Sequence, residues 1–212
     1  RIVSLEYLKY PPASCVSKYG RANFNNQSRF YATFNPISAI NEMKPEIGDL
    51  ITETTWKLKT EKKLIVVPIF FITSGDNGET HNALSINYKI EYDKMIRTYP
   101  KEEYLQYNEL LNFVSECFAK DVDYGNTYDY FLSAFFSNRI FNEINKGQVE
   151  AIVYPRESET LGFSNIVIKP NVFDDKYELF EINEKIVKNT KPCWYLEPTG
   201  YTKNVKDNVI IW

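Results

Sequence analysis

Apolar residues recur at helical spacing in two segments in the middle of the chain. In residues 101–120 they fall on one face of a helix, and they are Leu110, Leu111, Val114, Cys117 and Phe118. A second helix is expected over residues 128–145, ended by Gly147 because glycine readily adopts the left-handed conformation that follows a helix. These two helices are the strongest local predictions.

A shorter helix is expected to begin near Asn35. Asn35 supplies an N-cap and Pro36 a first-turn proline, which predicts a helix through about Met43. Pro45 and Gly48 then end it.

The remaining apolar segments favour strands, because their apolar residues alternate or run continuously. Strands are expected at 2–7, 29–33, 50–58, 64–72, 151–154, 166–169, 177–182 and 209–212. Pro68 places its strand at a sheet edge or a bulge. Residues 80–99 are ambiguous, and the alternation of Leu84, Ile86, Tyr88 and Ile90 favours a strand. Residues 11–28 read as a long loop and 74–78 as a turn.

Strands, then helices, then strands indicate the α+β class. The chain has 212 residues with neither an internal repeat nor a composition that would mark a linker, so residues 1–212 are predicted to form a single domain. Hydrophobic residues make up 43% and charged residues 25%, as is usual for a globular protein. The net charge of −3 argues against a dedicated nucleic-acid binder.

Several features favour a cytoplasmic protein. Cys15, Cys117 and Cys193 have no paired spacing, which favours reduced thiols. The longest apolar run, residues 64–72, is too short to span a membrane. Residues 1–10 lack the layout of a signal peptide, and the start at Arg1 rather than Met leaves open whether residues precede it.

The sequence also disfavours several kinds of site. His81 is the only histidine, which removes zinc sites that need two imidazoles and disfavours histidine-based acid-base chemistry. Neither glycine-rich phosphate motif, GxGxxG or GxxxxGK[ST], occurs. The acidic stretches lack the spacing of a calcium loop, so no metal site is predicted.

One ordered set of short motifs carries chemical information. It consists of Gly20-Arg21-Ala22-Asn23, Arg29-Phe30-Tyr31-Ala32, Ala39-Ile40-Asn41-Glu42, Ala151-Ile152-Val153-Tyr154-Pro155 and Gly162-Phe163-Ser164-Asn165-Ile166. Between about residues 20 and 170 the chain resembles the RES domain family, which has a GRxN turn, a strand with Tyr, a helix bearing Glu, a YPS strand and a GxN strand. No single motif is specific, but their order gives the set weight.

The resemblance implies an ADP-ribosyltransferase-like mixed sheet with flanking helices that binds and cleaves NAD⁺. It also implies a toxin or defence effector that depletes NAD⁺, is neutralised by a protein antitoxin and admits a homodimer. NAD⁺ is then the substrate, and no separate cofactor is expected.

The three candidate catalytic residues suit this chemistry. Nicotinamide leaves as a neutral molecule, so its departure needs no proton, and Glu42 would stabilise the positive charge that develops on the ribose. Arg21 offers a planar fork for the pyrophosphate, and Tyr31 offers a ring on which nicotinamide can stack. Each also has a structural interpretation, as a solvated loop arginine, a core aromatic and a polar position at the edge of an amphipathic helix.

One position departs from the family pattern, because Arg156 stands where the family has Ser after Tyr-Pro. Ser133, Ser158 and Ser164 are candidates for that serine, and Arg156 could instead add a phosphate contact. With Asn23 and Asn165, the predicted substrate-binding residues are Asn23, Ser133, Arg156, Ser158 and Asn165.

Three functions stay open from the sequence. The first is release of nicotinamide with water or inorganic phosphate as acceptor, by a glycohydrolase or phosphorylase. The second is ADP-ribosyl transfer to a protein or nucleic acid, which Ile40 mildly disfavours because transferases of this fold often carry an acidic residue two positions before the catalytic Glu. The third is an inactive domain that binds a nucleotide or a protein partner.

Overall fold

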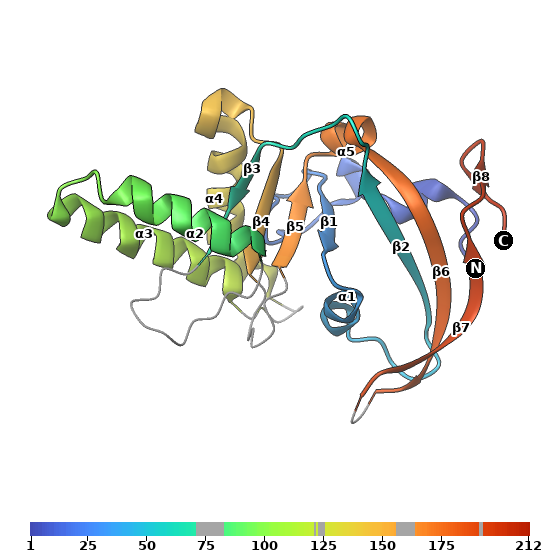
Figure 1. Ribbon diagram of the computed structural model, residues 1–212. Coiled ribbons are helices and arrows are strands. Elements are labelled where there is room, and N and C mark those ends of the chain that lie inside the picture. The colour runs from blue at the N-terminus through green and yellow to red at the C-terminus, as the bar shows by residue number, and fades with distance from the viewer. Residues whose placement is uncertain (71–82, 121, 123–125, 156–163, 191–192) are drawn as a thin grey trace.

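The computed structural model describes residues 1–70, 83–120, 122, 126–155, 164–190 and 193–212, and it contains two large β-sheets (Figure 1). The first sheet has the strand order β1 (Phe30–Thr33), β5 (Ser164–Ile168), β4 (Ala151–Pro155), β3 (Val66–Pro68). Strands β1, β5 and β4 pair antiparallel, and β3 pairs parallel with β4. Pro68 thus lies on an edge strand, as predicted, where a missing N–H is tolerated.

The second sheet is antiparallel and is built from β2 (Leu50–Leu58), β6 (Tyr177–Asn189) and β7 (Tyr195–Thr202), in that order. A small hairpin of β8 (Val205–Lys206) and β9 (Val209–Ile210) follows. Strand β2 is an edge of the second sheet and β1 is an edge of the first.

The α-helices are α1 (Pro36–Met43), α2 (Ala83–Ile96), α3 (Lys101–Ala119), α4 (Phe131–Glu143) and α5 (Pro170–Lys176). Helices α2, α3 and α4 flank the first sheet on the side away from the second sheet, whereas α1 and α5 lie between the two sheets (Figure 1). The 3₁₀ helices are η1 (Leu5–Leu8), η2 (Ala13–Cys15), η3 (Thr127–Tyr130) and η4 (Ile144–Gly147). No helix in the described ranges has the length and apolarity needed to cross a membrane.

A separate hydrophobic cluster covers each face of the first sheet. Val114 and Phe118 of α3 and Phe141 of α4 pack with Ile152 and Val167 on one face. On the other face Phe30, Ile166 and Ile168 pack with Phe173 of α5 and Trp56 of β2. Phe30 and Phe173 stack with ring centroids 3.9 Å apart. The alternation of side chains along β1, β5 and β4 therefore separates two environments.

Helices, one mixed sheet and one antiparallel sheet are present, which agrees with the predicted α+β class, and most elements lie where they were expected. Two segments differ. Residues 2–7 were expected to be a strand, but only Ser4 pairs, in a single bridge to Val209, and η1 follows. The expected strand at 80–99 is instead α2, whose second half contains good helix formers and an i,i+3 ion pair between Lys94 and Glu91 at 2.7 Å.

Four elements were not predicted, namely η2, α5, β7 and β8, and part of the prediction lies outside the described residues. Helix α5 begins at Pro170, and β7 was not expected because Pro198 and Gly200 interrupt its pattern. Strand β6 runs to Asn189, beyond the expected end at residue 182. Residues 71–72 of the expected third strand and the expected turn at 74–78 are among those not described.

Candidate functional site

The predicted site residues that the structure describes gather on the face of the first sheet that α4 covers. Thr33, Asn165 and Tyr154 pair across β1, β5 and β4, so their side chains form one row across the sheet. Tyr31 lies two residues before Thr33 and points to the same face.

Helix α1 brings Glu42 to this row. The side chain of Asn35 accepts a hydrogen bond from the Ile37 N–H at 2.7 Å, so the predicted N-cap is confirmed. Near the other end of α1, Glu42 Oε1 accepts a hydrogen bond from Asn165 Nδ2 at 3.0 Å. Asn165 is buried, with 6% of its surface exposed, and it fixes the orientation of the half-buried carboxylate.

The Gly20–Asn23 turn holds the hydroxyl of Tyr31. Gly20 and Asn23 form an isolated bridge, with Gly20 N donating to Asn23 O at 3.0 Å. Tyr31 donates its hydroxyl proton to Asn23 Oδ1 at 2.7 Å and accepts from the Ala22 N–H at 2.9 Å. A Cβ on Gly20 would lie 2.3 Å from Asn23 Oδ1, so this close packing requires glycine. Two of the motifs that carry the family resemblance thus form one hydrogen-bonded unit.

Arg21 joins the turn to the end of α3. Its Nη1 donates to the carbonyl oxygens of Phe118 and of Lys120, the latter at 3.0 Å. Cations are favoured there because the carbonyls at a helix C-terminus carry partial negative charge. The guanidinium also lies over the ring of Tyr130, 5.0 Å from its centroid. Arg21 therefore has a structural contact in addition to any role in binding phosphate.

Tyr154 is buried and interacts electrostatically with the other groups of the cluster. Burial raises its pKa well above the ordinary value, as do Tyr31, Glu42 and Tyr130, whereas Arg21 lowers it. Burial of the Tyr31 hydroxyl likewise raises the pKa of Tyr31, which stays neutral at physiological pH although 40% of the residue is exposed. The cluster thus combines one carboxylate, one guanidinium and three phenols.

Of the predicted substrate-binding residues, two contact the catalytic candidates, one is buried on α4, and the others are not described or have no described side chain. Asn23 is buried and bonded to Tyr31, and Asn165 contacts Glu42. Ser133 on α4 is fully buried and donates to the carbonyl oxygen of Tyr130 at 3.0 Å. Arg156 and Ser158 lie outside the described residues, as does the side chain of Ser164.

Two residues of the cluster were not predicted as site residues. Tyr154 belongs to the Tyr-Pro motif that supports the resemblance, so its place in that motif was an available signal. Tyr130 ends η3 just before α4, and nothing in its local sequence separates it from the other tyrosines.

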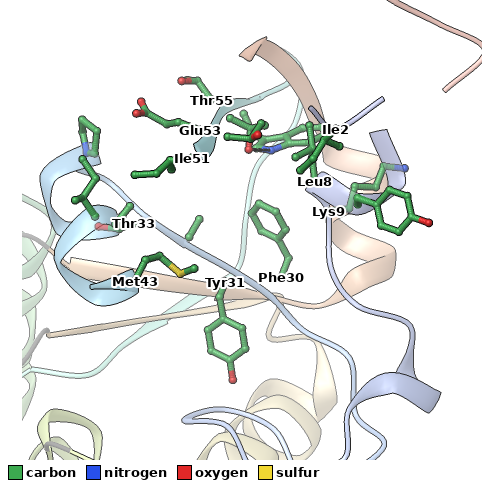
Figure 2. Close-up of a pocket in the computed structure, with 18 of the residues that line it drawn as sticks. Ile2, Leu8, Lys9, Phe30, Tyr31, Thr33, Met43, Ile51, Glu53 and Thr55 are labelled. Carbon is green, nitrogen blue, oxygen red and sulfur yellow. Dashed lines mark hydrogen bonds between the residues drawn. The ribbon is translucent and has the colours of Figure 1, made fainter. Parts of the chain in front are cut away.

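A groove of about 1300 Å³ lies on the opposite face of the first sheet, between α1, β1 and β2 (Figure 2). Its walls are mainly apolar and include Phe30, Met43, Ile51, Trp56, Ile166 and Ile168. Figure 2 shows Phe30 and Tyr31 pointing in opposite directions from β1. Tyr31 contributes to the lining, but Arg21, Glu42 and Asn165 do not.

Among the described residues, no three side chains of the His, Cys, Asp and Glu types come together in a way that could hold a metal ion. The polar cluster itself offers a carboxylate held by Asn165, hydrogen-bond donors and aromatic faces. A comparison of the chain with protein-family models, with curated proteins and with solved structures found no match.

Proposed function

We propose that the chain is an NAD⁺-consuming enzyme of ADP-ribosyltransferase-like fold that cleaves the bond between nicotinamide and ribose. The observation that carries the proposal is the Glu42 carboxylate, held by Asn165 at 3.0 Å beside Tyr31, Tyr154 and Arg21. These groups come from distant parts of the chain, and they belong to the motifs on which the resemblance to the RES family rests.

The arrangement suits a reaction in which positive charge develops on a ribose. Because nicotinamide leaves as a neutral molecule, one carboxylate can suffice, whereas ordinary glycoside hydrolysis needs a second carboxyl group as acid. A carboxylate whose direction is fixed before the reaction stabilises the oxocarbenium-like transition state without reorganisation. In the proposal Glu42 provides this charge and Asn165 orients it.

The aromatic groups suit a planar leaving group. Tyr31 keeps 40% of its surface exposed while its hydroxyl is held by Asn23 and Ala22. A fixed ring of this kind can stack against nicotinamide with little loss of side-chain entropy. Arg21, which is anchored through Nη1, would hold the neighbouring turn in place.

The acceptor of the ribose is water or inorganic phosphate in this proposal. Depletion of NAD⁺ by such an enzyme agrees with a role as a toxin or defence effector restrained by a protein antitoxin, which the resemblance implies.

The proposal is tested by incubating the purified chain with NAD⁺, with and without inorganic phosphate. Free ADP-ribose with nicotinamide indicates hydrolysis, a phosphorylated ADP-ribose indicates phosphorolysis, and label on a macromolecule indicates transfer. Glu42→Gln should lower the rate of nicotinamide release by ~10²-fold or more, because it removes the charge while keeping the size of the side chain. The enzymatic proposal fails if the wild-type chain and Glu42→Gln are equally inert.

A second candidate function is ligand binding without turnover, which the groove between the two sheets favours. Its mainly apolar walls, around a volume of about 1300 Å³, offer a surface that a ligand or a partner could cover. An inert chain whose unfolding midpoint rises with a nucleotide or a purified partner would support this candidate.

A further inference from the structure

Two cations lie side by side at the end of the first sheet opposite to Glu42. The β1 and β5 ladder ends with the pair Phe30 and Ile168, and the next residues outward are Arg29 and Lys169. Both side chains contact the buried ring of Phe141 on α4, with the Arg29 guanidinium 4.8 Å and Lys169 Nζ 5.4 Å from the ring centroid. They therefore share the α4 face of the sheet with Tyr31.

No carboxylate neutralises this pair within the described part of the chain. The carboxylate that raises the pKa of Lys169 is that of Glu150. Its Oε1 accepts a hydrogen bond from Lys176, and its Oε2 accepts from the Ile65 N–H at 2.9 Å. Both carboxylate oxygens of Glu150 thus already accept hydrogen bonds from other groups.

Both cations also keep hydrogen-bond donors that the described residues leave unused. Arg29 has five N–H donors and uses Nη1, which donates to the carbonyl of Ser28 at 3.0 Å. Lys169 has three donors and uses two, to the carbonyls of Phe141 and Gly147 at 3.1 and 3.0 Å. Arg29 Nε is buried without a partner, and so is the hydroxyl of Ser137, one turn before Phe141 on α4.

From this geometry we infer that Arg29 and Lys169 form a binding site for a phosphate-type oxyanion. A guanidinium fork beside an ammonium group matches the several acceptor oxygens of a phosphate. Two adjacent cations that keep unused donors and have no counter-ion among the described residues are features that a bound anion would relieve.

The charge state agrees with this assignment. Burial and then the charge of Arg29 lower the pKa of Lys169, and burial lowers the pKa of Arg29. A bound oxyanion would favour the charged form of both groups, so the anion and the two protonated side chains stabilise one another.

The position of the site relates it to the cleavage chemistry. Arg29 precedes Tyr31 by two residues, or roughly 7 Å along an extended strand, and Asn165 with Glu42 lies farther along the same face. The ligand is either free inorganic phosphate or the diphosphate of a nucleotide. Its assignment to the diphosphate of NAD⁺ rests on the proposed function, whereas the anion site itself does not.

Titration calorimetry on the full chain tests the site without turnover, with inorganic phosphate, pyrophosphate and ADP-ribose as separate probes. The wild-type chain should bind at least one of them, and Arg29→Gln and Lys169→Gln should each weaken binding by about tenfold or more. Arg139→Gln is the matched control, because Arg139 is exposed on α4, where it contacts Glu143 and the ring of Phe135, so binding should not change. Binding of phosphate alone assigns the site to the free ion, and tighter binding of ADP-ribose assigns it to a nucleotide diphosphate.

The inference is overturned if the wild-type chain binds none of the three probes, or if both variants bind like the control. Circular dichroism establishes that each variant is folded. If Arg29→Gln does not fold, Arg29→Lys replaces it, which keeps the charge but loses the fork and should weaken binding to a smaller extent. Glu42→Gln should bind the anion like the wild-type chain even if no nicotinamide release is found, so the two proposals can fail independently.

Discussion

The amide of Asn165 donates to the carboxylate of Glu42 at 3.0 Å, although the two residues are 123 positions apart in the chain. Glu42 lies on α1, the helix that follows β1, and Asn165 lies on β5, an interior strand of the first sheet. The contact therefore reports both the docking of α1 and the pairing of β1 with β5.

Asn165→Ala should lower kcat for nicotinamide release and leave KM nearly unchanged, because Asn165 positions Glu42 and does not itself hold the substrate in the proposal. A hydrogen bond to a charged group contributes about 1.5–3 kcal/mol, which corresponds to roughly a 10- to 100-fold effect on rate. Steady-state kinetics measure both constants, with Asn171→Ala as control because Asn171 is exposed on α5. A rise in KM with an unchanged kcat would contradict the positioning role.

Tyr31→Phe should destabilise the fold by about 1–3 kcal/mol, because it leaves the Asn23 side chain and the Ala22 N–H without the phenolic oxygen that they now contact. Urea unfolding measures the change. Tyr7→Phe provides the comparison, since Tyr7 is 81% exposed and should lose almost no stability. Equal free energies of unfolding for the two variants would mean that the hydroxyl does not hold the turn.

Asn35→Ala removes the N-cap of α1 and should lower the free energy of unfolding by ~1 kcal/mol. Since α1 carries Glu42, the rate of nicotinamide release should fall as well. Asn35→Ser keeps a side chain that can cap the helix and should restore both quantities. A loss of stability without any change in rate would contradict the view that the cap of α1 positions Glu42.

Stability should fall as the pH rises from 10 to 12. Burial and then the hydrogen bond to Asp174 raise the pKa of Tyr10 from 10.0 to about 12, and burial and then Glu150 raise that of Tyr177 to about 12. A pKa that is higher in the folded than in the unfolded protein gives stability that is fully present below pH 10 and is lost as the pH rises through 12. Urea unfolding across this range should show a smaller loss for Tyr10→Phe, and an identical loss would contradict the assignment.

Local elements could be predicted from sequence because their causes are local. The Asn35 cap and Pro36 define the start of α1, and the glycine at 147, with a φ of 78°, ends the segment after α4. Residues 83–96 were misassigned because four alternating apolar residues imitate a strand while the helix-favouring residues that decide the outcome follow them.

The prediction that these residues share a site rested on the order of the motifs along the chain and not on any single residue. The motifs around Arg21, Tyr31 and Glu42 suggested a shared location, and the sheet brings them together with Asn165. The anchoring of Arg21 on the last carbonyls of α3, and the central position of Tyr154, arise from contacts between distant segments. No periodicity in the sequence encodes such contacts.

The strand order of the two sheets has a consequence for how the chain reaches its native state. Strand β1 pairs with β5, which begins at residue 164, and β2 pairs with β6, which begins at residue 177. Each early strand can therefore pair only after that later strand has been synthesised. Folds dominated by such distant pairings close long loops before they gain contacts, and they fold slowly for their size. Until then the edges of β1 and β2 are open to pairing with other chains, so the incomplete chain is more exposed to aggregation than the finished one.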